Sequence, residues 1–148
     1  MITDAIKMKG SLNIKLIDEN HSLKDERNIN NLVVAVGKTY IANRMTSNSN
    51  TIMSHMAVGN GNVAPVVGDT ILVGELARVA LDSSSRTNNV ITYVATFAAG
   101  TGTGSIAEAG IFNNGTANAG SMLCRTNFNV VNKGASDVIV ITWNVTVA

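Results

Sequence analysis

The strongest constraint on the fold is a stretch in the middle of the chain, residues 77–112, in which apolar and polar residues alternate. It reads ARVALDSSSRTNNVITYVATFAAGTGTGSIAEAGIF, with a turn at Asn88-Asn89 and a glycine-threonine loop at 100–104 before a third apolar run. A period of two is typical of strands that bury one face, and asparagine or glycine pairs are typical of the turns between them. The stretch therefore predicts antiparallel strands.

The same kind of pattern recurs along most of the chain. We expect eight strands, over residues 11–17, 22–30, 52–58, 77–82, 89–98, 105–113, 121–131 and 138–147. Between the second and third of these, apolar residues fall at helical spacing, which predicts one helix over residues 32–45, capped by Asn30 or Asn31. About seven to eight strands with a single helix indicate a mainly β fold, an antiparallel β-sandwich or jelly-roll-like domain.

The domain organisation is predicted to be simple. A chain of 148 residues can bury one core, so we expect a single domain, with residues 1–10 as an N-terminal arm. The charged run at 24–27 indicates that the strand over 22–30 lies at a sheet edge. The first residues lack the apolar segment of a secretion signal, and no apolar run approaches the roughly 20 residues of a membrane helix. We therefore expect synthesis in the cytoplasm, with the single Cys124 as a packed thiol.

No constellation of residues in the chain predicts chemistry. The glycine-rich runs at 59–62 and 100–104 lack the lysine and hydroxyl that a phosphate loop needs. His21 and His55 are the only histidines, and neither belongs to a metal-binding pattern. A net charge of +1 gives no general attraction to nucleic acid or to anionic membrane. We predict a protein that is not an enzyme and has no cofactor, metal or small-molecule substrate.

The distribution of charge is more informative than its sum. Residues 45–148 hold only nine charged side chains, and their polar positions are mostly Asn, Thr, Ser and Gly. Such a surface loses little free energy when it is desolvated against a neighbouring subunit. The alternative interpretation is an ordinary solvated β surface.

Eight residues are candidates for contacts with other subunits. They are Met1, Ile2, Ile6, Lys7, Lys9, Met53, Met56 and Glu108. The first five belong to the arm. The methionines, together with Met45, either pack in the core or form an adaptable contact surface. Glu108 is unusual because it interrupts an apolar strand; it either faces a subunit boundary or pairs with Arg78 or Arg125.

Several segments together resemble a family of small virion proteins of tailed bacteriophages. They are residues 31–45 (NLVVAVGKTYIANRM), 54–62 (SHMAVGNGN), 75–81 (ELARVAL), 90–97 (VITYVATF), 102–112 (GTGSIAEAGIF) and 132–147 (NKGASDVIVITWNVTV). Proteins of this kind are described as tail-fibre-like proteins or as capsid decoration (cement) proteins. The second resemblance implies a jelly-roll-like sandwich, usually trimeric, on the outside of the capsid where major capsid subunits meet.

The resemblance sets the functional expectations. The leading one is a capsid cement protein, made in the bacterial host cytoplasm, whose partners are the major capsid protein and its own copies in a trimer. The arm at 1–9 and the loops at 46–51 and 59–68 would then contact capsid or sister subunits. The main alternative is a tail, baseplate or fibre component that presents loops to a partner or a host glycan. A third hypothesis, a small glycan hydrolase, would need paired carboxylates such as Glu108 and Asp82.

Overall fold

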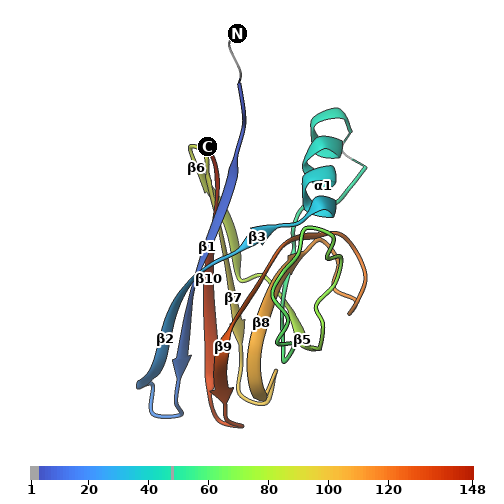
Figure 1. Cartoon of the computed structure of the whole chain (residues 1–148). Helices are drawn as coiled ribbons and strands as arrows, with labels where there is room; N and C mark the ends of the chain where they lie inside the picture. Colours follow the sequence, from blue (N-terminus) through green and yellow to red (C-terminus); the bar gives the residue numbers. More distant parts are fainter. Residues whose placement is uncertain (1–3, 48) are drawn as a thin grey trace.

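The computed structural model describes residues 4–47 and 49–148, and it consists of two β-sheets packed face to face with one helix at one end (Figure 1). The elements in chain order are β1 (Met8–Ile17), β2 (Leu23–Asn30), β3 (Leu32–Val33), α1 (Ala35–Thr46), β4 (His55–Gly59), β5 (Glu75–Ala80), β6 (Ser83–Thr87), β7 (Val90–Phe97), β8 (Gly104–Phe112), β9 (Met122–Lys133) and β10 (Val138–Val147). The expected mainly β sandwich with a single short helix is confirmed.

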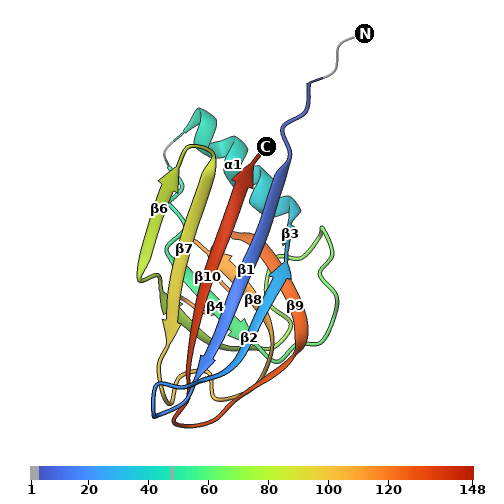
Figure 2. The same ribbon diagram turned by 90° about the vertical axis from the view of Figure 1, so that its left-hand side faces the viewer.

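Each sheet has five antiparallel strands. Sheet A has the order β2-β1-β10-β7-β6, which Figure 2 shows face on, and sheet B has the order β3-β9-β8-β4-β5. The charged strand β2 lies at the edge of sheet A, as its composition predicts. The first and last strands, β1 and β10, pair in the middle of sheet A along their whole length.

The core lies between the two sheets. Alternate residues of β1 and β10 point inward, among them Leu12, Ile141 and Trp143, and they face Met56 and Ile111 of sheet B. Trp143 is fully buried, and its indole N–H donates a 2.7 Å hydrogen bond to the side-chain oxygen of Asn31. Of the two faces that the sequence of β10 offers, the one with the largest side chains is therefore buried.

The hairpin at Asn88 is formed by different strands from those expected. The sequence pattern pairs residues 77–82 with 89–98, but β5 lies in sheet B beside β4, and β6 is the strand that pairs with β7. The chain crosses from sheet B to sheet A between β5 and β6. The residues of β6 are SSSRT, all exposed, so they carry no apolar alternation by which the strand could be predicted. Asn88 takes a positive φ of 53° in the turn, as asparagine tolerates.

The helix begins three residues later than predicted. Leu32 and Val33 form the short strand β3 beside Cys124 and Arg125 of β9, so they are not available to a helix. Val34 then occupies the N-cap position without a capping side chain. No helix in the described part of the chain is long or apolar enough to span a membrane.

Candidate protein-binding surface

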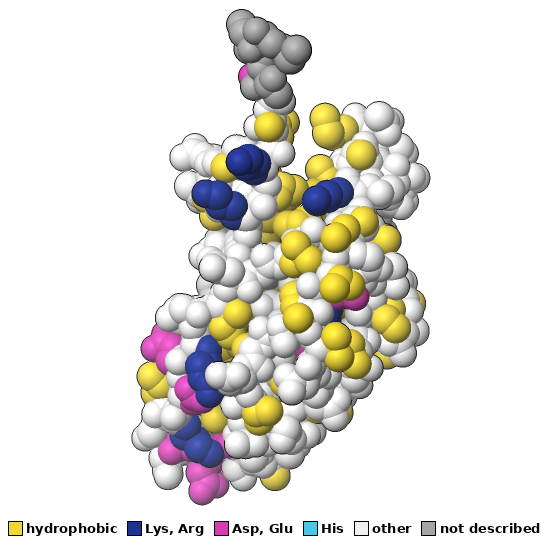
Figure 3. All heavy atoms as spheres, in the orientation of Figure 1, with side chains coloured by type: hydrophobic (Ala, Val, Ile, Leu, Met, Phe, Trp, Pro, Cys, Tyr) yellow, Lys and Arg dark blue, Asp and Glu magenta, His cyan; other side chains and the backbone are white. Residues whose placement is uncertain are grey.

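The segment between β4 and β5, residues 60–74, covers the outer face of sheet B, and we call it the valine loop. Its Leu72 is 1% exposed and packs with Phe112 and Met122 in a small second core on that face. Its other aliphatic side chains are between 44% and 58% exposed, namely Val63, Val66, Val67, Ile71 and Val73. In Figure 3, several groups of apolar side chains reach the surface of the face shown, with uncharged polar groups and backbone between them. The loop therefore presents an apolar outer surface.

The carboxylate of Glu108 holds both ends of the valine loop. Glu108 lies on β8 beneath the loop and is completely buried. Its Oε1 accepts hydrogen bonds from the backbone N–H of Gly61 at 3.0 Å and of Gly74 at 2.7 Å, and its Oε2 accepts one from Val73 at 3.0 Å. A side chain at Gly61 would collide with this carboxylate, which explains the glycine there.

The guanidinium of Arg125, on the neighbouring strand β9, completes the anchor. It donates to Glu108 Oε2 from Nε at 3.2 Å and from Nη2 at 2.9 Å. Its Nη1 donates to Asp69 Oδ2 at 2.9 Å, and Nη2 also donates to the carbonyl of Val63 at 2.8 Å. One buried arginine thus ties the middle of the loop to the sheet.

This anchor leaves the loop surface both ordered and neutral. Burying charged groups is unfavourable unless each is paired and hydrogen-bonded, and here Glu108 and Arg125 satisfy each other. Asp69 is the only charged residue in the valine loop, and it is paired with Arg125. An apolar loop that is already held in one conformation loses little entropy when it binds, so its burial favours association.

A second buried ion pair holds the loop between β8 and β9. Arg78 of β5 pairs with Glu75 at 2.7 Å, and the two side chains are 3% and 5% exposed. Arg78 also lies 3.7 Å from the centre of the Phe112 ring and donates to the carbonyls of Asn114 and Ala119. Arg78 is thereby engaged elsewhere, and Arg125 is the partner of Glu108.

The structure contradicts three of the predicted contact residues. Met53, Met56 and Glu108 are 3%, 0% and 0% exposed, so their side chains are enclosed within this chain and offer no surface to another subunit. The methionines fill the core because β4 lies inside sheet B. Met45, by contrast, lies on the far end of α1 and is 80% exposed.

The remaining predicted contact residues lie in the N-terminal arm. Met1 and Ile2 are outside the described residues. Ile6 and Lys7 precede β1 and are exposed, and Lys9 lies at the beginning of β1 on its outer side. Sequence reasoning did not identify Ile71 and Val73; the signal for them was a stretch of many aliphatic residues with one charge and no regular period.

The geometry offers no reactive group at this surface. Both oxygens of Glu108 are occupied by donors from the protein, so a substrate has no access to them. Burial raises the pKa of the Cys124 thiol, which is fully enclosed as predicted. The described residues contain no group of three His, Cys, Asp or Glu side chains that could hold a metal ion.

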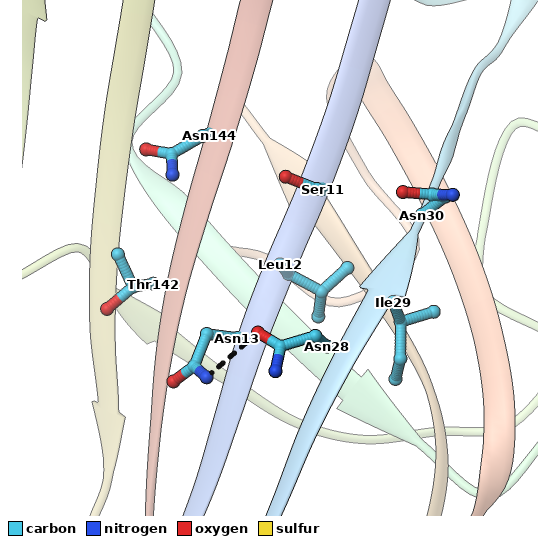
Figure 4. Close-up of a pocket in the computed structure, with 8 residues that line it drawn as sticks. All are labelled: Ser11, Leu12, Asn13, Asn28, Ile29, Asn30, Thr142 and Asn144. Carbon is cyan, nitrogen blue, oxygen red and sulfur yellow. Dashed lines mark hydrogen bonds between the residues drawn. The ribbon is translucent and has the colours of Figure 1, made fainter.

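The outer face of sheet A is a second, polar surface. Paired residues form a row across all five strands, consisting of Asn30, Ser11, Asn144, Thr92 and Ser85. Beside this row lies a hollow of about 190 Å³ that Asn13, Asn28 and Thr142 help to line, and the amide of Asn13 donates to Asn28 at 3.1 Å (Figure 4). Amide and hydroxyl groups line the hollow, and the amide of Asn13 also donates to Glu26 at 2.7 Å. The charged side chains of this face lie on β1 and β2, among them Lys9, Lys15 and Glu26.

Comparison of the chain with family models, with curated proteins and with solved structures gave no match.

Proposed function

We propose that this protein acts by binding other proteins as a structural subunit of a bacteriophage virion. The observation that carries the proposal is the neutral, aliphatic surface of the valine loop, which the buried Glu108–Arg125 pair holds in place. Several large aliphatic side chains exposed together on one loop are typical of interaction sites. A preformed apolar surface without a reactive group fits adhesion better than catalysis.

Within this class, the function that we favour is capsid decoration. The resemblance of the sequence segments to capsid cement proteins supports this choice, since it implies a sandwich bound outside the capsid at junctions between major capsid subunits. The valine loop would then face the major capsid protein. Each copy needs only a modest affinity, because capsid symmetry repeats the contact many times.

Substitution of the valine loop surface tests the proposal. The double variant Val67→Asn/Ile71→Asn changes two exposed side chains that are not part of the anchor, so the fold should persist. We expect it to lose capsid occupancy in a binding assay with purified expanded capsids, read by cryo-electron microscopy. The control is Ile52→Asn, which changes a side chain that is 61% exposed and lies outside the loop. Full occupancy by the double variant would contradict the proposal.

A tail or fibre component is the second candidate, and the outer face of sheet A favours it. Rows of amide and hydroxyl groups around a shallow hollow can form hydrogen bonds with a neutral saccharide. In that case the isolated protein should bind host cells, and Asn13→Ala/Asn28→Ala should abolish this binding. Density for the chain on the tail of the particle would support this candidate and exclude capsid decoration.

A further inference from the structure

The dipeptide Asn-Gly occurs twice in the sequence, at Asn60-Gly61 and at Asn114-Gly115, and the fold places the two in different settings. In this dipeptide the backbone nitrogen of glycine can attack the side-chain carbonyl carbon of asparagine, because glycine has no side chain that shields its nitrogen. The attack removes the side-chain amide without an enzyme. It requires a glycine nitrogen that is free to move toward the asparagine side chain.

At Asn60-Gly61 the glycine nitrogen is not free. Gly61 is buried, and its N–H donates the 3.0 Å hydrogen bond to Glu108 Oε1 that anchors the valine loop. The N–H of Asn60 in turn donates to the carbonyl of Gly74 at 2.9 Å. Attack by the nitrogen of Gly61 therefore requires this anchor to open first.

At Asn114-Gly115, in the loop between β8 and β9, both residues are exposed. The N–H of Gly115 donates to no acceptor among the described residues. A Cβ at Gly115 would lie 2.8 Å from Nε2 of His55, so the close approach of the imidazole explains why this residue is glycine. The loop thus places Asn114 next to a glycine nitrogen that no hydrogen bond protects.

Two hydrogen bonds at Asn114 are made to the two carbonyl oxygens that the reaction involves. The backbone N–H of Thr116 donates to the side-chain Oδ1 at 2.7 Å, and Nη1 of Arg78 donates to the backbone oxygen at 2.9 Å. Negative charge develops on each of these oxygens when a nucleophile adds to its carbon. Donors that already contact the oxygens stabilise this charge. The folded loop therefore supplies one donor for each carbonyl group of Asn114.

We propose that Asn114 is a site of spontaneous deamidation in the folded protein, and that isoaspartate is its main product. In the first step the nitrogen of Gly115 forms a bond to Cγ of Asn114. The bond between Cγ and the amide nitrogen breaks, and ammonia leaves with the proton of the Gly115 N–H. The resulting cyclic imide contains both carbonyl groups of residue 114.

Water then opens the imide ring, and Arg78 favours one of the two possible positions. Addition of water at the backbone carbonyl carbon breaks its bond to the nitrogen of Gly115, so the chain continues through Cγ and residue 114 becomes isoaspartate. Addition at Cγ gives ordinary aspartate. Because Arg78 donates to the backbone oxygen, addition at the backbone carbonyl is favoured.

The product also remains in contact with Arg78. The former backbone carbonyl becomes a free carboxylate beside the guanidinium, where a charge-assisted hydrogen bond stabilises it. Arg78 is already paired with Glu75, so the modified loop gains a negative charge. No enzyme takes part, and the modified fraction therefore increases with the age of the protein.

Peptide mapping by mass spectrometry, after incubation of the full chain in a mildly alkaline buffer, tests the site. In the folded protein Asn114 should be deamidated at least about tenfold faster than Asn60, because Asn60 reacts only when the valine-loop anchor opens. In concentrated urea both should react at similar rates. Asn114→Gln should abolish the mass increase of the folded protein, since the longer side chain cyclises far more slowly, and the matched control Asn60→Gln should leave it unchanged.

Reversed-phase chromatography separates peptides with isoaspartate from those with aspartate. The isoaspartate fraction at residue 114 should be higher in the folded protein than in urea, because only the folded chain holds Arg78 at the backbone carbonyl. Equal rates at Asn60 and Asn114 in the folded protein, or an Asn114 that reacts only in urea, would overturn the site. An isoaspartate fraction no higher than in urea would overturn the role of Arg78. The proposed function rests on the valine loop and is independent of these results.

Discussion

At the scale of single residues, Glu108 and Arg125 form a buried ion pair on the outer face of sheet B. Such pairs often contribute little net stability compared with an apolar pair of the same size, because removing two charges from water is unfavourable. Here their effect is geometric. The carboxylate of Glu108 accepts hydrogen bonds from the backbone of Gly61 and Gly74, at opposite ends of the valine loop. The conformation of the valine loop therefore depends on the Glu108–Arg125 pair.

Removal of the carboxylate should be strongly destabilising. We expect Glu108→Ala to lower the free energy of unfolding by about 3 to 5 kcal/mol, because buried Arg125 loses its buried partner and keeps only the partly exposed Asp69, and three backbone N–H groups lose their acceptor. Urea denaturation measures this change. Glu19→Ala, at an exposed turn, should stay within about 0.5 kcal/mol of the wild type. The double variant Glu108→Leu/Arg125→Met should recover part of the loss, and an equal loss in both variants would argue against an isolated charge as the cause.

A second residue, Asp137, links stability to pH. The ammonium of Lys24, 2.8 Å away, and then the backbone N–H of Gly134 hold the pKa of this carboxyl below its ordinary value of 3.8. A depressed pKa in the folded state stabilises the protein above pH 3.8, and this stability is lost as the pH falls through the folded value. Urea midpoints of wild type and Asp137→Asn should therefore differ at neutral pH and converge in acid. A constant difference across the range would exclude the linkage.

At the scale of elements, the contact between α1 and β9 depends on a glycine. Gly37 lies in the first turn of the helix, and glycine within a helix normally lowers its stability by up to about 1 kcal/mol relative to alanine. A Cβ at this position would overlap the backbone of Leu123, including its carbonyl oxygen. The glycine lets the first turn of the helix approach β9 closely.

Substitution of this glycine should have the opposite sign from that of an ordinary helical glycine. We expect Gly37→Ala to destabilise the protein by about 1 to 3 kcal/mol through overpacking. Gly68→Ala is the matched control, because no atom lies within 4 Å of the position that its Cβ would take. The control should be neutral or stabilising by up to about 1 kcal/mol. Thermal unfolding followed by circular dichroism distinguishes the two, and a stabilised Gly37→Ala would show that the helix is not tightly seated.

The elements differ in how far the sequence determines them. β1 and β10 are predictable because their inward residues alternate strictly, and β2 is predictable as an edge because it is charged. β6 is not, since an exposed SSSRT segment has no apolar face and becomes a strand only by pairing with β7. Which sheet a strand joins depends on contacts between residues distant in sequence. The local pattern of β5 therefore could not show that it pairs with β4 in sheet B.

The same reasoning applies to the candidate surface. Glu108 was recognisable as anomalous because it stands between alanines in an apolar strand. Its choice of Arg125 over Arg78 depends on the register of β8 against β9, which spacing alone does not reveal. The valine loop has no period, so the residue pattern does not show which of its side chains are exposed. The resemblance pointed to residues 59–68, whereas Ile71 and Val73 were identified only from the fold.

At the scale of the whole molecule, the two ends of the chain meet in the middle of sheet A. β10 lies between β1 and β7, and its inward residues Ile141 and Trp143 belong to the core. We therefore expect deletion of residues 138–148 to abolish folding, with loss of the cooperative thermal unfolding transition followed by far-ultraviolet circular dichroism. Deletion of residues 1–5, which precede the sheet, should leave this transition unchanged. A folded product of the longer deletion would show that sheet B and the β1–β2 hairpin suffice.

The central position of β10 also has a consequence in time. About 120 residues separate the end of β1 from the start of β10, which corresponds to on the order of ten seconds of synthesis on the ribosome. By the end of that interval both β1 and β7 have been made, but β10, the strand that lies between them in sheet A, has not. The apolar side of the early hairpin, including Leu12 and Ile14, stays uncovered for as long. A nascent chain of this protein is therefore most exposed to aggregation just before its last strand is made.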